Sequence, residues 1–152
     1  MQALIDRYGL APHPEGGYYR EVYRSGLRLN SPAAGEDRHA ATHIYFMLTE
    51  GQVSRFHRVV HDELWHFYQG APLRLHQYDG NAVTSATIGP DRDYMAVVPG
   101  NVWQAAESTG EYSLVGCTVA PGFDFADFSF LGDVPDALAG LKGDHPEYRR
   151  FI

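Results

Sequence analysis

Residues 51–70, GQVSRFHRVVHDELWHFYQG, hold three histidines, one aspartate and one glutamate between two glycines. Strand-forming residues alternate with these titratable groups, and side chains two positions apart on a strand lie on the same face. One strand can therefore point His57 inward. After a tight turn, the next strand can point Glu63, Trp65 and Phe67 into the same interior. The stretch predicts two neighbouring strands with a polar pocket between them.

Length, composition and charge limit the classes of protein to consider. A chain of 152 residues predicts a single domain, residues 1–152. A formal charge of −7 argues against nucleic-acid partners and anionic membranes, which both favour a basic surface. No apolar run approaches the roughly 18 residues of a membrane-spanning helix, and the single Cys117 fits a reducing compartment. We therefore expect a cytoplasmic protein that binds neither nucleic acid nor membrane.

Short strand-like segments, separated by Gly, Asp, Asn or Pro turns, follow one another along most of the chain. Strands are expected at residues 18–24, 39–50, 73–78, 82–88, 94–98, 102–106 and 111–120. Helices are expected only near the ends, at residues 1–10, at 133–141 with Asp133 as N-cap, and at 146–151. Residues 29–38 are expected to form a loop. Regular short strands of this kind predict a sandwich or a barrel.

The spacing within residues 51–70 resembles the first sequence motif of the cupins, which reads Gly, five residues, His-x-His, three or four residues, Glu, six residues, Gly. Gly51, His57, Glu63 and Gly70 occupy four of its five fixed positions, and Val59 stands at the second His. The resemblance implies an all-β fold, the double-stranded β-helix or jelly-roll barrel of the cupins.

The second cupin motif, Pro-x-Gly, two residues, His, resembles PGNVWQ at residues 99–104, where Gln104 stands in place of the His. Glutamine is a poor ligand for zinc or iron, and a mononuclear site normally takes three or more protein ligands. Two of the four usual metal positions are therefore replaced. We expect no cofactor; if a divalent metal binds, its ligands are His57, Glu63 and Gln104.

Four longer stretches resemble one small, uncharacterised family of single-domain cupins, and they occur in that family's order over most of the chain. They are PHPEGGYYREVYRS at residues 12–25, FHRVVHDELWHFYQGAPL at 56–73, VPGNVWQAA at 98–106 and LVGCTVAPGFDFADF at 114–128. The resemblance implies a jelly-roll barrel with short terminal helices, a homodimer, and a shape related to that of epimerases acting on nucleotide-linked deoxysugars. It does not imply a particular reaction.

His57 and Glu63 are the candidate catalytic residues. In the first hypothesis, the protein is an isomerase or epimerase on a sugar-like or nucleotide-linked substrate. His57 removes a proton beside a carbonyl and Glu63 orients the imidazole, while Tyr45 or Tyr19 serves as the acid on the far face. The alternative is a non-catalytic cupin that binds or senses a small molecule with the same groups, and the third hypothesis is a metal-dependent dioxygenase.

Further side chains are candidates for binding the ligand. Gln104 is expected to complete a polar triangle with His57 and Glu63. Trp65 and Phe67 are expected first in the core, although aromatic walls can also stack on a flat ligand.

The strand expected at residues 18–24 alternates Tyr19, Glu21 and Tyr23 on one face with Arg20 and Arg24 on the other. Neither face is plainly apolar. We interpret it as an edge strand at a subunit contact, and the alternative is that Glu21 or Arg20 reaches a ligand.

The remaining histidines of residues 51–70 and the aromatic stretch near the C-terminus also have predicted positions. His61, at the predicted turn, is expected to be exposed, and His66 is expected to lie on the opposite face from Glu63 in a structural or interface role. The stretch PGFDFADFSF, residues 121–130, is expected to cover the barrel or a partner subunit with aromatic side chains. Its alternative is a lid over the barrel mouth with an acidic residue facing the ligand.

Overall fold

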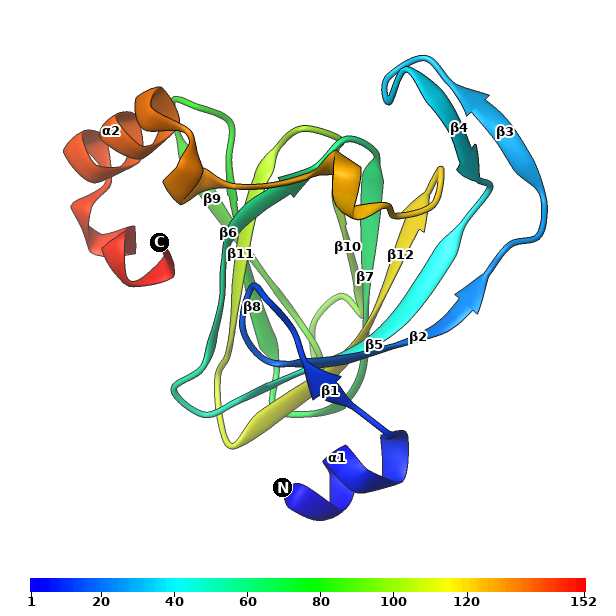
Figure 1. Ribbon diagram of the computed structural model, residues 1–152. Coiled ribbons are helices and arrows are strands. Elements are labelled where there is room, and N and C mark those ends of the chain that lie inside the picture. Colours follow the sequence, from blue (N-terminus) through cyan, green and yellow to red (C-terminus); the bar gives the residue numbers. More distant parts are fainter.

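Two large antiparallel sheets form the body of the computed structural model, which describes residues 1–152 (Figure 1). The six-stranded sheet contains, in spatial order, β1 (Ala11–Pro12), β2 (Tyr18–Arg24), β5 (Thr42–Thr49), β12 (Tyr112–Ala120), β7 (Asp62–Gly70) and β10 (Met95–Val98). The five-stranded sheet contains β13 (Phe128–Phe130), β6 (Val53–Val59), β11 (Trp103–Ser108), β8 (Leu73–Tyr78) and β9 (Val83–Ile88).

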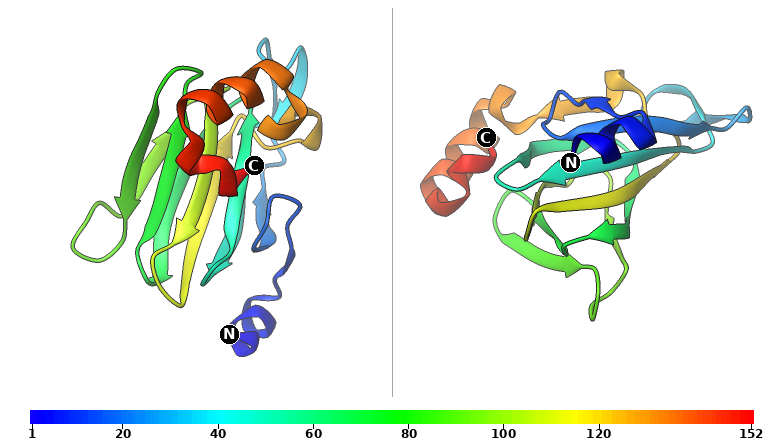
Figure 2. Two further views of the ribbon diagram at one scale, coloured as in Figure 1. Left: turned by 90° about the vertical axis from the view of Figure 1, so that its left-hand side faces the viewer. Right: turned by 90° about the horizontal axis from the view of Figure 1, so that it is seen from below.

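The chain passes back and forth between these sheets. Strands β5, β7, β10 and β12 lie in the first sheet, whereas β6, β8, β9 and β11, which come between them in the sequence, lie in the second. Figure 2 shows the two layers wrapping around a shared interior. This is the jelly-roll arrangement, so the predicted all-β cupin fold is confirmed, and each of the strands expected from the sequence is present within a few residues of its predicted bounds.

Helices lie near the two ends of the chain, as expected. Helix α1 (Gln2–Tyr8) ends at Gly9, whose φ of 61° is left-handed and suits a residue without a Cβ. Helix α2 (Pro135–Asp144) and the 3-10 helix η3 (Pro146–Phe151) cover the outer face of the five-stranded sheet (Figure 2). None of the helices combines the length and the hydrophobicity that crossing a membrane requires.

The start of the C-terminal helix differs from the prediction. Asp133 is not its N-cap, because this residue ends the 3-10 helix η2 (Leu131–Asp133). Helix α2 begins after Val134 without a side-chain cap. Leu141 and Phe151 anchor the segment in an apolar cluster with Phe56 of β6, so burial of apolar side chains fixes this helix rather than capping.

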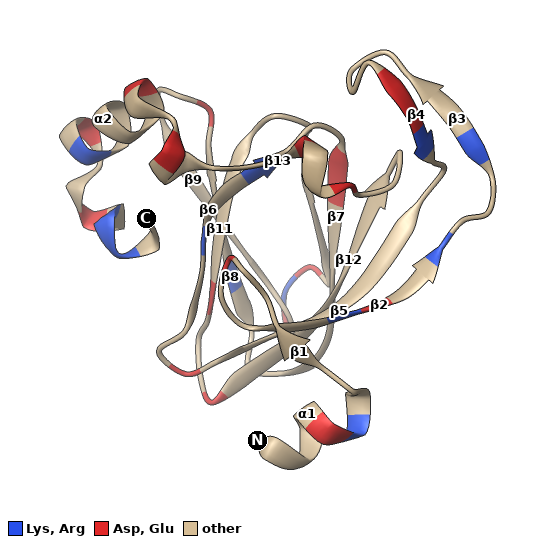
Figure 3. Ribbon diagram, viewed as in Figure 1, with Lys and Arg blue, Asp and Glu red and all other residues tan.

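The expected loop at residues 29–38 is wrong in part. Strands β3 (Arg28–Ser31) and β4 (Glu36–His39) pair there as a separate two-stranded hairpin that projects from the barrel (Figures 1 and 2). The hairpin carries both acidic and basic residues (Figure 3). The sequence of this hairpin is polar and charged and lacks the alternating apolar residues that predict a strand. Its contacts with other segments are described below.

A β-bulge at Val22 changes which side chains of β2 face the interior. Glu21 pairs with Ile44 of β5 but Tyr23 already pairs with His43, so Val22 is an extra residue. Beyond the bulge the alternation is reversed. Arg24 therefore lies on the same face as Tyr19 and Glu21, where regular alternation predicted Tyr23, and the Tyr23 side chain is exposed.

A second irregularity lies in β6. Gln104 of β11 pairs with His57, whereas Ala106 pairs with Ser54, so three residues of β6 span two residues of β11. Ser54 and His57 consequently face the same side although they are three positions apart, which a regular strand does not allow. Phe56, between them, is buried under the C-terminal helices instead.

Apolar side chains fill only part of the barrel interior. Phe46, Leu48, Trp65, Phe67 and Val115 belong to one buried cluster between the two sheets. The remaining part of the interior is bordered by polar side chains, and it contains the candidate site.

Candidate functional site

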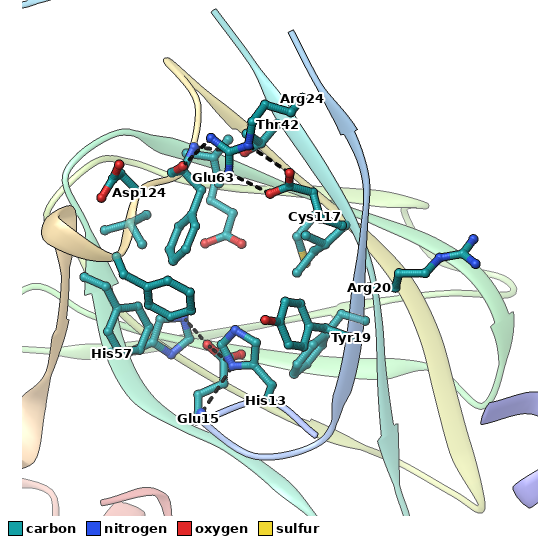
Figure 4. A pocket seen from close by; sticks show the side chains of 18 of the residues that line it. His13, Glu15, Tyr19, Arg20, Arg24, Thr42, His57, Glu63, Cys117 and Asp124 are labelled. Atoms are coloured by element: carbon teal, nitrogen blue, oxygen red, sulfur yellow. Dashed lines mark hydrogen bonds and ion pairs between the residues drawn. The ribbon is translucent and has the colours of Figure 1, made fainter. Parts of the chain in front are cut away.

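A cavity of about 640 Å³ opens into the barrel interior (Figure 4). Half of its twenty lining residues are hydrophobic, and the polar ones come from separate segments. The polar side chains are those of His13 and Glu15 of the loop 12–17, Tyr19, Arg20, Glu21 and Arg24 of β2, Thr42 of β5, His57 of β6, Glu63 of β7 and Asp124 of the segment 121–130. Cys117 and Val119 of β12, Val59 of β6, and Phe123, Phe125 and Phe128 are among the other lining residues.

Glu15 is the central buried carboxyl of the inner wall. Its Oε1 accepts a hydrogen bond from Ser54 Oγ at 2.7 Å, and its Oε2 lies 3.1 Å from His57 Nε2 and 3.5 Å from His13 Nδ1. The loop that carries it is held to β6 by the hydrogen bond from the Arg55 amide to the Glu15 carbonyl, 2.9 Å long. Gly16 follows, and any Cβ there would collide with the carbonyl oxygen of Val53, so the close approach of the loop to β6 requires glycine.

Glu15 and His57 share one proton. The Arg55 carbonyl lies 2.7 Å from His57 Nδ1, so this nitrogen carries a proton and donates it. His57 Nε2 faces Glu15 Oε2, and that contact also needs a proton between the two atoms. Burial lowers the pKa of His57 and raises the pKa of Glu15. Both shifts favour the neutral pair, in which the Glu15 carboxylic acid donates to the imidazole.

His13 presents its other ring nitrogen to the cavity. The Glu15 amide donates to His13 Nδ1 at 3.2 Å, so the proton of the neutral ring is on Nε2. Burial lowers the pKa of His13, which favours this neutral form. The ring packs edge-on against Tyr19 at 4.5 Å between centroids, and Figure 4 shows both side chains directed into the cavity.

Glu63 is the second buried carboxyl, and Figure 4 shows it pointing into the cavity. Gln104 Nε2 donates to Glu63 Oε2 at 2.5 Å, and Trp65 Nε1 donates to Gln104 Oε1 at 2.8 Å. Because an indole N–H can only donate, it fixes the orientation of the Gln104 amide. Burial raises the pKa of Glu63 to about 7, against the opposing effect of His57. Cys117, beside it, has its thiol pKa raised by burial.

Arg24 lies at the outer part of the cavity, and protein groups already occupy its guanidinium. Its Nε and Nη2 donate to the two carboxylate oxygens of Glu21 at 2.8 and 2.6 Å. Its Nη1 donates to the Phe123 carbonyl at 3.2 Å. Hydrogen bonding to Glu21 raises the pKa of Arg24 further above its ordinary value.

The segment 121–130 forms the aromatic side of the cavity. Phe123, Phe125 and Phe128 line it together with Asp124, and the Phe128 ring stacks on the His57 ring at 5.2 Å. The segment therefore covers one side of the cavity with aromatic rings, and its Asp124 also lines the cavity; the lid of the alternative interpretation stays a prediction.

A buried cluster joins this segment to the projecting hairpin. Asp127 receives two hydrogen bonds from Arg38 of β4, each 2.8 Å. His61 lies 3.8 Å from Asp127 and 2.6 Å from the Ser31 hydroxyl of β3. His61 is therefore buried, and the expectation that it is exposed at the turn is wrong. The hairpin and the 3-10 helix η1 (Phe125–Asp127) are held as one unit.

The structure brings four of the predicted site residues to the cavity. His57, Glu63, Tyr19 and Glu21 line it. Gln104 does not, because it lies behind Glu63 and reaches the cavity only through that carboxyl.

Three aromatic candidates for ligand binding require correction. Trp65 and Phe67 face the interior as predicted, but they are buried in the apolar cluster and do not line the cavity. Tyr45 lies on the outer face of the sheet, next to Tyr8 and Tyr68. His66 also lies on that outer face, with its ring 6.1 Å from His43, which confirms the face predicted for it.

Several lining residues were missed by the sequence interpretation. His13 and Glu15 belong to the motif PHPEGG. Two titratable residues among prolines and glycines could have indicated a loop that carries functional side chains. Arg24 was missed because of the bulge in β2, and Cys117 because a lone cysteine in a strand has no distinguishing pattern.

The side chains present do not fit a mononuclear metal site. Both ring nitrogens of His57 face protein groups, Val59 supplies no donor, and Gln104 is behind Glu63. No group of three His, Cys, Asp or Glu side chains is arranged to hold a metal ion.

Comparison with known proteins agrees with this architecture. The model of the family described as Cupin superfamily (DUF985) matches residues 2–131. An uncharacterised protein of Saccharomyces cerevisiae is 30% identical over 162 residues, which cover 94% of this chain and 80% of that protein.

Solved structures show the same similarity over nearly the whole chain. A hypothetical protein from Leishmania major is 32% identical, with a TM-score of 0.86 and coverage of 98% of this chain and 96% of the other. A protein from Shewanella oneidensis is 31% identical, with a TM-score of 0.86 and coverage of 99% and 95%. A dTDP sugar isomerase from Desulfovibrio desulfuricans G20 is similar in fold alone, at 15% identity and a TM-score of 0.56 over 80% of this chain and 85% of that one.

Proposed function

The chain belongs to the cupin superfamily, in the family DUF985, and we propose that it binds a small polar or sugar-like molecule in the barrel cavity and catalyses a proton transfer on it, as isomerases and epimerases do. The observation that carries this proposal is the position and the raised pKa of the Glu63 carboxyl. Its carboxyl faces the cavity with a pKa of about 7, so it can accept or release a proton near neutral pH.

Glu63 replaces His57 as the proposed base. Both ring nitrogens of His57 are directed at protein groups, the Arg55 carbonyl and Glu15. The earlier role for Glu63, orienting the imidazole, is also wrong, because those two groups orient it. In the proposed reaction, Glu63 removes a proton from a carbon beside a carbonyl group.

Two donors support the other half of the reaction. The Tyr19 hydroxyl and the Nε2–H of His13 are directed into the same cavity (Figure 4), where either can donate a hydrogen bond to the oxygen that gains negative charge. Tyr45, the other predicted acid, lies on the outer face of the sheet and takes no part. Return of the proton from Glu63 to the neighbouring carbon completes an isomerisation. In an epimerisation, Tyr19 or His13 instead donates its proton to the opposite face of the same carbon, and Glu63 passes the proton that it removed to solvent.

Native mass spectrometry of freshly purified protein, with elemental analysis of the same sample, provides the first test. A retained organic molecule identifies the substrate class, and stoichiometric metal would instead favour the dioxygenase hypothesis. The retained molecule is then incubated with the protein in D₂O. Proton transfer predicts deuterium at one carbon, which is lost in Glu63→Gln while binding remains, and Glu111→Gln, at an exposed position, is the matched control.

The same experiment separates the enzyme from its alternative. If the wild-type protein binds the molecule but incorporates no deuterium, the protein is a non-catalytic binding or sensing cupin, because that function needs the cavity without the proton transfer. Loss of binding in Glu63→Gln would fit the alternative equally well, so the wild-type measurement decides.

The partners and location inferred from the sequence remain proposals. We propose a homodimer in the cytoplasm, with no nucleic-acid or membrane partner. The outer face of the six-stranded sheet supports a subunit contact, since Tyr68, Met95 and Val97 are exposed there. Native mass spectrometry measures the subunit count directly, and a monomer would contradict the homodimer.

A further inference from the structure

We infer that the ligand of the cavity is an organic cation, whose ammonium group lies between the aromatic segment 121–130 and the carboxyl of Glu63. The inference rests on the proposed function in one respect, since it takes the same cavity as the ligand site. It narrows the substrate class, because a nucleotide-linked sugar carries phosphate groups and is anionic.

The ionisable side chains that line the cavity are mainly acidic. Glu15, Glu21, Glu63 and Asp124 contribute carboxyls, whereas the only arginines are Arg20 and Arg24, and no lysine is present. The guanidinium of Arg20 lies 5.8 Å from the ring of Tyr45 on the outer face, and Figure 4 shows it directed away from the cavity. It cannot bind a ligand inside.

The remaining arginine is not available to an anion. Glu21 and the Phe123 carbonyl together engage Nε, Nη1 and Nη2 of Arg24. A phosphate or carboxylate would have to displace the Glu21 carboxylate, leaving that negative charge next to its own. His13 and His57 supply no positive charge either, since burial favours their neutral forms.

Aromatic rings form another part of the cavity wall. Phe123 and Phe125 meet edge to face at 4.9 Å between centroids, and Phe125 lies 6.1 Å from Phe128. Tyr19 lines the cavity from β2. The faces of aromatic rings attract ammonium groups, and several rings around one space are a recognised way of binding quaternary ammonium ions.

Glu63 is the carboxyl placed to meet that charge. The titratable groups around it are His57, Glu15 and Cys117, and Gln104 holds its Oε2. None of these neighbours is a cation at neutral pH, so the carboxylate has no fixed counter-ion. A bound ammonium group would supply one, and its binding is then coupled to the release of the Glu63 proton.

Three molecules of nearly the same shape test the sign of the charge. Choline is a cation, 3,3-dimethylbutan-1-ol is its neutral carbon analogue, and 3,3-dimethylbutanoate is an anion. Calorimetric titration at pH 8 is expected to show choline binding about tenfold or more tightly than the alcohol, from the attraction of a desolvated cation to aromatic rings. The butanoate is expected to bind more weakly than both.

The pH dependence identifies Glu63 as the group that meets the cation. Glu63 attracts the cation only when its carboxyl is ionised, and its pKa is about 7. The ionised fraction falls about tenfold from pH 8 to pH 6, so the affinity for choline is expected to fall about tenfold as well. This dependence should disappear in Glu63→Gln, which keeps the shape of the side chain. The exposed control Glu111→Gln should retain it. Circular dichroism confirms that each variant is folded.

Equal or tighter binding of the alcohol or the butanoate overturns the inference, and so does an absence of saturable choline binding. A tenfold pH effect that persists in Glu63→Gln also overturns it, because another group would then meet the cation. None of these results affects the proposed function, which is tested by deuterium incorporation into the molecule that the protein retains. A retained neutral or anionic substrate with turnover would refute the cation while supporting the enzyme.

Discussion

Replacing Glu63 with glutamine is expected to stabilise the protein at alkaline pH. The folded state holds this carboxyl with a pKa of about 7, against 4.5 as its ordinary value. Above pH 4.5 the unfolded chain loses the proton while the folded protein keeps it, so the folded state is penalised as the pH rises, until the group is ionised in both states above pH 7. Glutamine removes the ionisation and with it the penalty.

The size of the effect follows from the difference between the two pKa values. Each pKa unit corresponds to about 1.4 kcal/mol, so the full difference is about 3 kcal/mol at pH 8 and only a small part of that at pH 5. For a chain of this length, about 3 kcal/mol corresponds to roughly 6–12 °C in melting temperature. Gln104 can still donate to the amide oxygen of the new side chain, because Trp65 fixes its orientation.

Urea denaturation of the wild type and of Glu63→Gln, followed by tryptophan fluorescence at pH 5, 6, 7 and 8, measures the free energy of unfolding. The advantage of the variant is expected to grow with pH. Glu111→Gln should show no such growth, since its carboxyl is exposed. A difference between Glu63→Gln and the wild type that is constant from pH 5 to pH 8, or that favours the wild type more at pH 8, would refute the raised pKa and the base role built on it.

Three other perturbations test separate parts of the structure. Gln104→Leu is expected to lower the free energy of unfolding in urea by about 1–3 kcal/mol, because it leaves the buried Trp65 indole N–H without a partner and removes one hydrogen bond from the Glu63 carboxyl; unchanged stability would contradict that network. Asp127→Asn removes the charge that faces Arg38. Amide hydrogen exchange should become faster in residues 121–130 but not in β7 and β12; an equal change in all three regions, or no change, would show that the pair does not hold this segment. Burial and two neighbouring arginines lower the pKa of His76 to about 4. Between pH 6.5 and pH 4, therefore, His76 is protonated in the unfolded chain but not in the folded protein. Stability should therefore fall from pH 6.5 towards pH 4, less steeply in His76→Gln, and parallel curves for the two proteins would count against this shift.

The period of the strands predicted the inner wall of the site from the sequence. His57 of β6 and Glu63 of β7 both face the interior, from the two different sheets, and from Glu63 to Phe67 the side chains alternate regularly along β7. The same alternation placed Trp65 and Phe67 inside the barrel, which is correct. The alternation could not predict how much of the barrel interior apolar side chains fill. That depends on how the side chains of the two sheets pack against each other, which no single strand determines.

What the sequence could not provide depends on bulges and on contacts between distant segments. An extra residue in β2 moved Arg24 inward, and another irregularity in β6 put Ser54 beside His57. Neither has a marked sequence signal, since no Gly stands at either position. Glu15 reaches both Ser54 and His57 from a loop about forty residues earlier in the chain, and only the folded barrel brings these three groups together.

The bulge at Val22 also governs how this protein can associate through its sheet edge. Strand β1 pairs only with Tyr18 and Tyr19, so the remaining residues of β2 have no neighbour on that side. A straight, open edge of that length would let another strand extend the sheet, which is how many β proteins aggregate. The bulge interrupts the row of backbone donors and acceptors there. This edge is therefore a poor template for a strand of another chain, which protects the protein against edge-to-edge aggregation.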